Sequence, residues 1–308
     1  MPLRSSRPYA GAADLRRMES GLAHAYSRTS LRVGDLSWLS REHTHRELSL
    51  DIHLWDDDAG QLIAWTYFRA NGEFNVFVAP GAGYEGDAAL FDELLAVVDE
   101  AARASVGAGD PPLSLCTYGV DPSRSPEDRA LAAALERSGF QVDPSLGGVM
   151  TRSLDQVPAP SLPDGYRLGW VQTRAHVIGR VEAHRAAFAP SDLSVLKYAR
   201  VQRTWPYRPM LDRVVLTHDD EIVAFCTAWL DEDNAAGLLE PVGTHPAHQR
   251  RGLARAVCTD ALHALREAGA RTAQVGFGSE SGYATYRAAG FAQTSTELAF
   301  IRSSTAAC

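Results

Sequence analysis

The chain has 308 residues, of which 45% are hydrophobic and 22% charged, and its formal net charge is −8. This length suits two α/β domains that each bury a core, and no run of about 20 apolar residues predicts a membrane span. The negative charge argues against broad nucleic-acid binding and fits a cationic amine as substrate. No apolar segment follows the N-terminal arginines, so we expect no secretory signal and a cytoplasmic protein.

The first half of the chain predicts a strand within 74–80, a loop from Gly83, a helix at 88–104 and a strand at 113–118. The apolar residues of 88–104 recur at helical spacing. A second helix ends before the pair Gly139-Phe140. A proline-rich segment from Asp155 to Gly165 then predicts an extended, stiff connector. We therefore expect two consecutive domains, 1–155 and 163–308.

The second half repeats this pattern after an added strand, a helix and a hairpin. A strand is expected at 166–170, a helix at 174–188, and a hairpin of 213–216 with 222–230. A strand that ends near Thr244, a helix at 253–268, a strand at 272–277 and a short helix before Gly290-Phe291 follow. The two Gly-Phe pairs lie nearly half a chain length apart, which indicates a degenerate internal repeat.

The loop Gln249-Arg250-Arg251-Gly252-Leu253-Ala254 predicts an anion site between a strand and a helix. The first N–H groups of a helix have no intrahelical partner and lie at the positive end of its dipole. Gly252 lets the backbone approach an anion, and Arg250, Arg251 and Arg255 add positive charge. The glycine patterns of nucleotidase phosphate loops and of dinucleotide folds are both absent.

This loop resembles the Gln/Arg-x-x-Gly-x-Gly/Ala signature of the GCN5-related N-acetyltransferase (GNAT) superfamily, where it holds the pyrophosphate of acetyl-coenzyme A. Tyr286 lies four residues before Gly290-Phe291, the position at which the superfamily has a tyrosine beside the thioester sulfur. The resemblance implies a mixed α/β fold of two tandem GNAT domains, an architecture similar to that of mycothiol synthase. It covers 163–308 and, more weakly, 8–155.

The first copy lacks three residues that the resemblance makes functional. Tyr84-Glu85 stands at the place of the arginine pair, Leu135 at that of Tyr286 and Phe74 at that of Glu240. A carboxylate about 4 Å from a diphosphate costs about 1–4 kcal/mol. We therefore expect a degenerate, non-catalytic first copy.

The resemblance implies that Glu240 is the general base and Tyr286 the general acid. Strand alternation places Glu240 on the face of Val242 and Thr244. The alternatives are a Glu240 that pairs with an arginine, a Tyr286 that only packs, and His245 or water as the base.

The resemblance also implies the residues that hold acetyl-coenzyme A, the expected co-substrate. The backbone of Val242, Gly243 and Thr244 would pair with pantetheine and polarise the acetyl carbonyl. Ser279 stands where an asparagine usually contacts the pantetheine arm. The loop residues Gln249 to Arg255 would hold the diphosphate.

We expect no metal, because His245 and His248 lie in a loop that contains no carboxylate or cysteine to complete a metal site. Cys116, Cys226, Cys258 and Cys308 lack Cys-x-x-Cys spacing and suit reduced thiols.

The expected function is an acyl-CoA-dependent N-acyltransferase that passes acetyl to a primary amine of a small molecule by direct attack. We expect a monomer or homodimer without nucleic-acid or membrane partners. The alternative is a non-catalytic CoA-binding sensor or interaction protein. Trp205 and Tyr207 either line the acceptor pocket or pack as surface aromatics.

Overall fold

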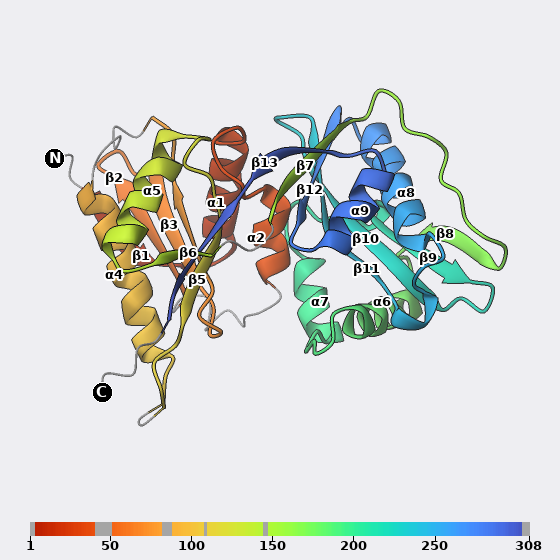
Figure 1. The fold of residues 1–308 in the computed structure, drawn as a ribbon, viewed down its shortest axis with the longest axis horizontal. Coiled ribbons are helices and arrows are strands. Elements are labelled where there is room, and N and C mark those ends of the chain that lie inside the picture. Colours follow the sequence, from red (N-terminus) through yellow and green to blue (C-terminus); the bar gives the residue numbers. More distant parts are fainter. Residues whose placement is uncertain (1–3, 41–50, 82–87, 108–109, 144–146, 304–308) are drawn as a thin grey trace. The chain divides into compact units, whose positions relative to one another are not determined.

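The computed structural model describes residues 4–40, 51–81, 88–107, 110–143 and 147–303 (Figure 1). Its contacts divide the chain into two compact units. One comprises Met1–Leu31, His43–Gly147 and Ser295–Cys308, and the other Arg32–Glu42 and Gly148–Thr294. Neither unit is a continuous half of the chain, so the division differs from the expected consecutive domains 1–155 and 163–308.

The second unit is built on a seven-stranded sheet with the strand order β13-β7-β12-β11-β10-β9-β8. Within this sheet β11 and β12 run parallel, and the other pairs for which a register is known are antiparallel. The strands are β7 (Gly148–Ser153), β8 (Tyr166–Trp170), β9 (Asp212–Thr217), β10 (Ile222–Asp231), β11 (Ala236–Thr244), β12 (Thr272–Phe277) and β13 (Ala292–Thr296).

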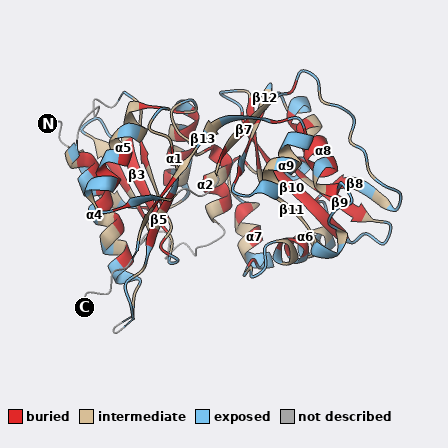
Figure 2. Ribbon diagram, viewed as in Figure 1, coloured by how far each residue is buried: buried red, intermediate tan, exposed pale blue. Residues whose placement is uncertain are grey.

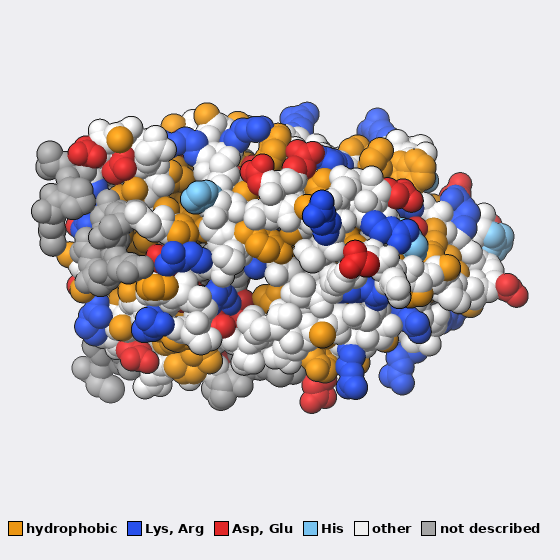
Figure 3. All heavy atoms as spheres, turned by 90° about the horizontal axis from the view of Figure 1, so that it is seen from above, with side chains coloured by type: hydrophobic (Ala, Val, Ile, Leu, Met, Phe, Trp, Pro, Cys, Tyr) orange, Lys and Arg blue, Asp and Glu red, His pale blue; other side chains and the backbone are white. Residues whose placement is uncertain are grey.

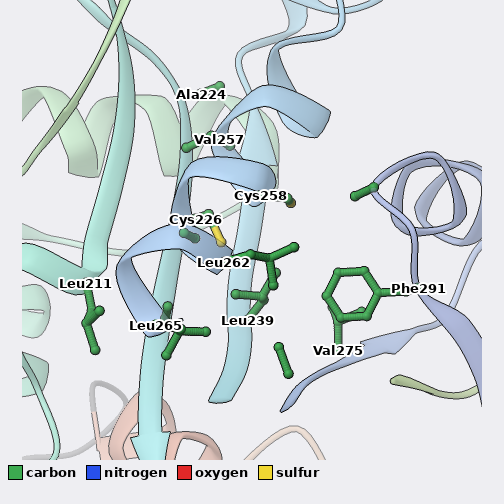
Figure 4. Close-up of a cluster of buried hydrophobic side chains, with 14 of the residues drawn as sticks. Leu211, Ala224, Cys226, Leu239, Val257, Cys258, Leu262, Leu265, Val275 and Phe291 are labelled. Carbon is green, nitrogen blue, oxygen red and sulfur yellow. The ribbon is translucent and has the colours of Figure 1, made fainter. Parts of the chain in front are cut away.

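Helices cover both faces of this sheet, because the buried strand β10 sends apolar side chains to either side. Cys226, Ala228 and Leu230 pack beneath α8 (Leu253–Glu267), with α9 (Glu280–Ala288) beside it. Phe225 and Trp229 lie on the other face, which is covered by α2 (Val33–Leu39), α6 (Arg174–Ala187) and α7 (Val195–Val201). Figure 2 shows the central strands buried, and Figure 4 shows the side chains that pack around α8.

The first unit contains two smaller sheets, ordered β1-β2-β3-β4 and β5-β14-β6. Its core includes Leu90, Leu94 and Leu135. The strand expected within 74–80 is found as β4, and the expected helix 88–104 is confirmed, whereas the loop with Tyr84, Glu85 and Gly86 lies outside the described residues. The strands are β1 (Arg4–Pro8), β2 (Ile52–Asp57), β3 (Leu62–Phe68), β4 (Phe74–Val78), β5 (Leu115–Val120), β6 (Gln141–Asp143) and β14 (Leu298–Arg302), and the helices are α1 (Ala12–His24), α4 (Ala88–Ala104) and α5 (Pro126–Arg137).

The two units exchange strands, which explains why the division is not consecutive. Strand β7 precedes the connector, yet it pairs with β12 of the second unit over its whole length. Strand β14 ends the described chain, yet it pairs with β5 and β6 of the first unit. Each exchange satisfies backbone groups that a sheet edge would otherwise leave unpaired.

The described surface is mixed in charge. Figure 3 shows basic, acidic and hydrophobic side chains interspersed on the face that it draws. None of the described helices combines the length and hydrophobicity that crossing a bilayer requires.

Candidate active site

Strands β11 and β12 separate after a short parallel stretch. Their residue pairs are Ala236 with Thr272, Gly237 with Ala273, and Leu238 with Gln274. Strand β11 then continues to Thr244, held only along its other edge by β10. We call this divergence the fork. The edge of β11 that faces the fork carries backbone N–H and C=O groups with which an extended ligand can pair.

A bulge lies in β11 just beyond the start of the fork. Cys226 pairs with Val242 and Ala228 with Leu239, so Glu240 and Pro241 together stand opposite one residue, Thr227. Leu239 and Val242 both pack on the α8 face, although they are three residues apart. Strict alternation therefore fails between Leu239 and Val242, and it no longer assigns a face to Glu240. Because the bulge adds one residue, the side chains that follow it lie on the face opposite to the one that alternation from Leu239 predicts.

The β11–α8 loop ends at an uncapped helix N-terminus. Gly252 is the N-cap residue of α8, with φ at +77°, and no side chain caps this end of the helix. The first turn of α8 contains no acidic residue. A Cβ at Gly252 would meet nothing within 4 Å, so glycine is required here by the left-handed backbone. The N–H groups at Leu253, Ala254 and Arg255 can therefore receive an anion.

The three arginines of this loop are exposed. Arg250 also adopts a left-handed backbone, with φ at +64°. Arg251 donates from Nη1 to the hydroxyl of Tyr166 at 2.8 Å, and that hydroxyl lies 3.0 Å from Nδ1 of His248. Gln249 donates from Nε2 to the carbonyl of Thr244 at 3.3 Å, which closes the loop. The loop thus has the positive charge and the exposed donors that a diphosphate requires.

Tyr286 lies on α9 and packs against the core beneath α8. Its ring meets Phe291 edge-on, with centroids 6.3 Å apart. Burial raises the pKa of Tyr286 well above its ordinary value, and Cys258, Glu240 and Cys226 raise this pKa further by electrostatic interaction. The phenol therefore keeps its proton near neutral pH, as a general acid must.

Glu240 is half-buried at the bulge. Its carbonyl accepts a hydrogen bond from Nε1 of Trp229 at 2.5 Å. Because Glu240 contributes to the pKa shift of Tyr286, the two expected catalytic groups lie within electrostatic reach of one another. Glu240 lies on β11 and Tyr286 on α9, and these two elements are separated by α8 and β12 in the chain.

Residues 181–291 match the model of the acetyltransferase (GNAT) family. This part of the chain is similar to GNAT acetyltransferases. The matched segment contains β11, the anion-binding loop and Tyr286. Among curated proteins, none matches this chain.

Solved GNAT structures resemble the chain over nearly its whole length. A GNAT from Sphaerobacter thermophilus has a TM-score of 0.65 and 18% identity, covering 97% of this chain and 95% of that one. A tandem GNAT protein from the clavulanic acid biosynthesis pathway has a TM-score of 0.63 and 14% identity, covering 99% and 100%. Saccharomyces cerevisiae N-myristoyltransferase has a TM-score of 0.59 and 11% identity, covering 98% and 79%. The expected tandem GNAT fold is thus confirmed.

His245 is poorly placed to act as the base in this GNAT unit. Its Nδ1 accepts a hydrogen bond from the N–H of Ala247 at 3.2 Å. A neutral ring with that acceptor carries its proton on Nε2 and has no further free lone pair. His245 also lines a cavity of about 450 Å³ whose carboxylates are Glu182, Asp219, Asp220 and Glu221. Asp220 pairs with Arg167, and the remaining carboxylates keep this lining acidic.

Ser279 caps α9, because its Oγ accepts from the N–H of Gly282 at 3.2 Å. Its contact with pantetheine stays a prediction. Tyr207 packs edge-on against Trp229 and donates to Asp212 at 2.9 Å, so it is a packing residue of this GNAT unit. Trp205 is 45% exposed.

Sequence reasoning missed a buried polar network on the α6 face of the sheet. Asp212 accepts hydrogen bonds from Thr227 at 2.9 Å, from Tyr207 and from Tyr198. Arg180, fully buried, donates to Thr227 at 3.2 Å. Thr227 is the residue opposite the bulge, so this network fixes the strand that backs Glu240. No sequence signal links Arg180 with Asp212, because the two lie on different elements without a fixed spacing.

Cys116, Cys226 and Cys258 are free thiols, and Cys308 lies outside the described residues. No group of three or more His, Cys, Asp or Glu in the described chain is arranged to hold a metal.

The charge of the loop leads to a first prediction. We expect the full chain to bind one molecule of coenzyme A, and replacing both Arg250 and Arg255 by alanine to weaken binding at least about tenfold. Each charge-assisted hydrogen bond to a phosphate is worth about 1.5–3 kcal/mol. Titration calorimetry measures both the stoichiometry and the affinity.

The matched control is Arg185→Ala, which removes an arginine from α6, away from the loop. It should leave the affinity within about twofold of the parent. The full chain is needed because the exchanged strands leave neither half with a complete sheet. Two equal sites per chain, or a double variant that binds like the parent, would contradict the prediction.

Proposed function

We propose that the protein is an acyl-CoA-dependent N-acyltransferase that passes acetyl from acetyl-coenzyme A to a primary amine of a small molecule. The observation that carries this proposal is that β11 diverges from β12 and then leads directly, through the β11–α8 loop, to the uncapped N-terminus of α8, all within the segment that matches the acetyltransferase family. An extended pantetheine arm fits the free edge of β11, and a diphosphate fits the loop at Gly252. The N-myristoyltransferase that shares this fold is described with bound myristoyl-CoA, which supports an acyl-CoA ligand.

The proposed reaction is a direct attack without a covalent enzyme intermediate. The amine nitrogen attacks the thioester carbonyl carbon, and Glu240 takes the amine proton directly or through water. Backbone N–H groups of Val242 to Thr244 stabilise the oxygen that becomes negative. The carbon–sulfur bond then breaks, and Tyr286 gives its proton to the departing thiolate. The products are an amide and free coenzyme A.

The second unit is proposed as the catalytic one and the first as degenerate. In the first unit Leu135 is fully buried and packs in the core, at the place that Tyr286 takes in the second. Phe74 is likewise fully buried where the second copy has Glu240. An apolar side chain at either place supplies neither a base nor an acid.

Activity measurements are needed to identify the amine acceptor. The carboxylates near His245 concentrate cations at this unit, which favours protonated amines over anionic acceptors. We propose a small-molecule amine and direct transfer without a metal.

The test is thiol release from acetyl-coenzyme A with a panel of primary amines, followed by mass spectrometry of the products. We expect amine-dependent release of thiol and a product heavier than the amine by one acetyl group. Reactions without amine give the background hydrolysis. Tight coenzyme A binding without release for any amine would favour the alternative, a CoA-binding sensor or interaction protein.

A further inference from the structure

Helix α2 comes from the first half of the chain but packs within the second unit. It is a short helix of seven residues, and its buried residues include Gly34 and Trp38. On the chain it follows α1, whose partners lie in the first unit. The position of α2 therefore brings residues from outside the family-matched segment 181–291 to the GNAT unit that carries the site.

On one side, α2 fixes the strand that carries Glu240. A Cβ added to Gly34 would lie 2.2 Å from Cγ of Trp229, so the helix backbone rests directly on that indole. Trp38 packs in the same cluster as Trp229 and Leu238. Nε1 of Trp229 in turn donates to the carbonyl of Glu240 at 2.5 Å. The contact runs from α2 through a single side chain to the bulge.

On the other side, α2 is bonded to β12. Arg32, the N-cap residue of α2, donates from Nε to Oε1 of Gln274 at 2.5 Å. Gln274 pairs with Leu238, and this is the last pair before β11 and β12 separate. The helix is thus attached to both strands at the point where the fork begins.

We propose that α2 is a positioning element of the acyl-transfer site, which clasps β11 and β12 where the fork opens and fixes the backbone of Glu240 through Trp229. This proposal rests on the proposed function. Beyond Leu238 the two strands no longer hold each other by hydrogen bonds, so another element must set their separation. A displacement of about 1 Å in a reacting group can cost about 100-fold in rate. The first half of the chain would then serve catalysis without a catalytic residue of its own.

The test variant is Gly34→Ala, which forces the Trp229 ring or α2 to move. We expect kcat with the best amine of the panel to fall about 10- to 100-fold. We also expect the affinity for coenzyme A to fall much less than kcat, because the anion-binding loop, which would hold the diphosphate, lies beyond Thr244 at the far end of β11. A helix that only packed would lower the melting temperature and leave kcat of the folded enzyme unchanged.

The matched control is Gly21→Ala in α1, the same change in a helix of the first unit. A Cβ there would meet Phe77 at 3.4 Å, an ordinary contact. A second variant, Trp229→Phe, removes the Nε1 donor to Glu240 and keeps an aromatic ring at the same position. If Gly34→Ala does not fold, Trp229→Phe carries the test, with the same expected loss in kcat.

The outcomes separate the two proposals. A loss of kcat that clearly exceeds the loss of coenzyme A affinity, in a folded protein, supports the positioning role of α2. Turnover within about twofold of the parent in the folded variants overturns the positioning role of α2. The proposed acyltransferase activity is then unaffected. Equal losses of kcat and coenzyme A affinity indicate general loosening and also overturn the positioning role. If the parent protein binds coenzyme A but acylates no amine, the proposed acyltransferase function is overturned, and the positioning role of α2 is overturned with it.

Discussion

Replacing Gly252 by valine is expected to abolish coenzyme A binding, with the dissociation constant raised at least about 100-fold, or about 2.7 kcal/mol. Gly252 has a left-handed backbone at the N-cap of α8 and open space around its Cα. A β-branched residue strains that backbone and fills the space in which the diphosphate would lie. Titration calorimetry on the folded variant measures the loss.

The control for backbone strain lies at the other end of the same helix. Gly269 also has a positive φ, +106°, and a Cβ at this residue would meet nothing within 4 Å. Gly269→Val should therefore cost similar stability while coenzyme A binding stays near that of the parent. An additional variant, Gly252→Asn, tests the effect of side-chain volume without backbone strain, because asparagine tolerates the left-handed region. Parent-like affinity in Gly252→Val would remove the anion-binding loop from the site.

Replacing Tyr286 by phenylalanine is expected to lower kcat by about 10²- to 10⁴-fold with little change in coenzyme A affinity. The change removes one hydroxyl and hardly any volume. A free thiol has a pKa of about 8.5, so the thiolate leaves fairly well unaided and the loss falls near the lower end of the range. Thiol-release rates at saturating acetyl-coenzyme A measure the effect.

The pH profile gives a second readout for Tyr286. Because burial raises the pKa of this phenol well above its ordinary value of about 10, the parent enzyme should not lose this acid on the basic side until the pH exceeds that value. Tyr283→Phe is the control, since Tyr283 lies on the same helix and packs edge-on against Phe277. A Tyr286→Phe rate within about threefold of the parent, at an unchanged melting temperature, would point instead to water as the proton source.

Local sequence patterns were sufficient for most elements of the fold. The helix at 88–104 and the strand at 272–277 have the expected bounds, because helical and strand periodicity is set by neighbouring residues. The anion-binding loop was also predictable, since a glycine at a helix start and its nearby arginines are close in the chain. The Gly-Phe pairs placed Tyr286 on α9 for the same reason.

The bulge at Glu240 was not predictable from the chain. It exists because two residues of β11 stand opposite Thr227, and Thr227 is held by Asp212 and Arg180. The register of two strands is a relation between segments, and alternation along one strand carries no information about it. For this reason alternation could not assign a face to Glu240, although its strand was predicted correctly.

The sequence by itself determined the two-copy pattern, the anion-binding loop and the residue types available for catalysis, because each of these depends on short-range spacing. Only the tertiary structure decided which strands complete which sheet and that α2 joins the second unit. A short strand such as β7 can satisfy its backbone groups at any unpaired sheet edge. Its own residues do not distinguish those edges, so the choice is made by long-range packing, which also builds the fork around Glu240.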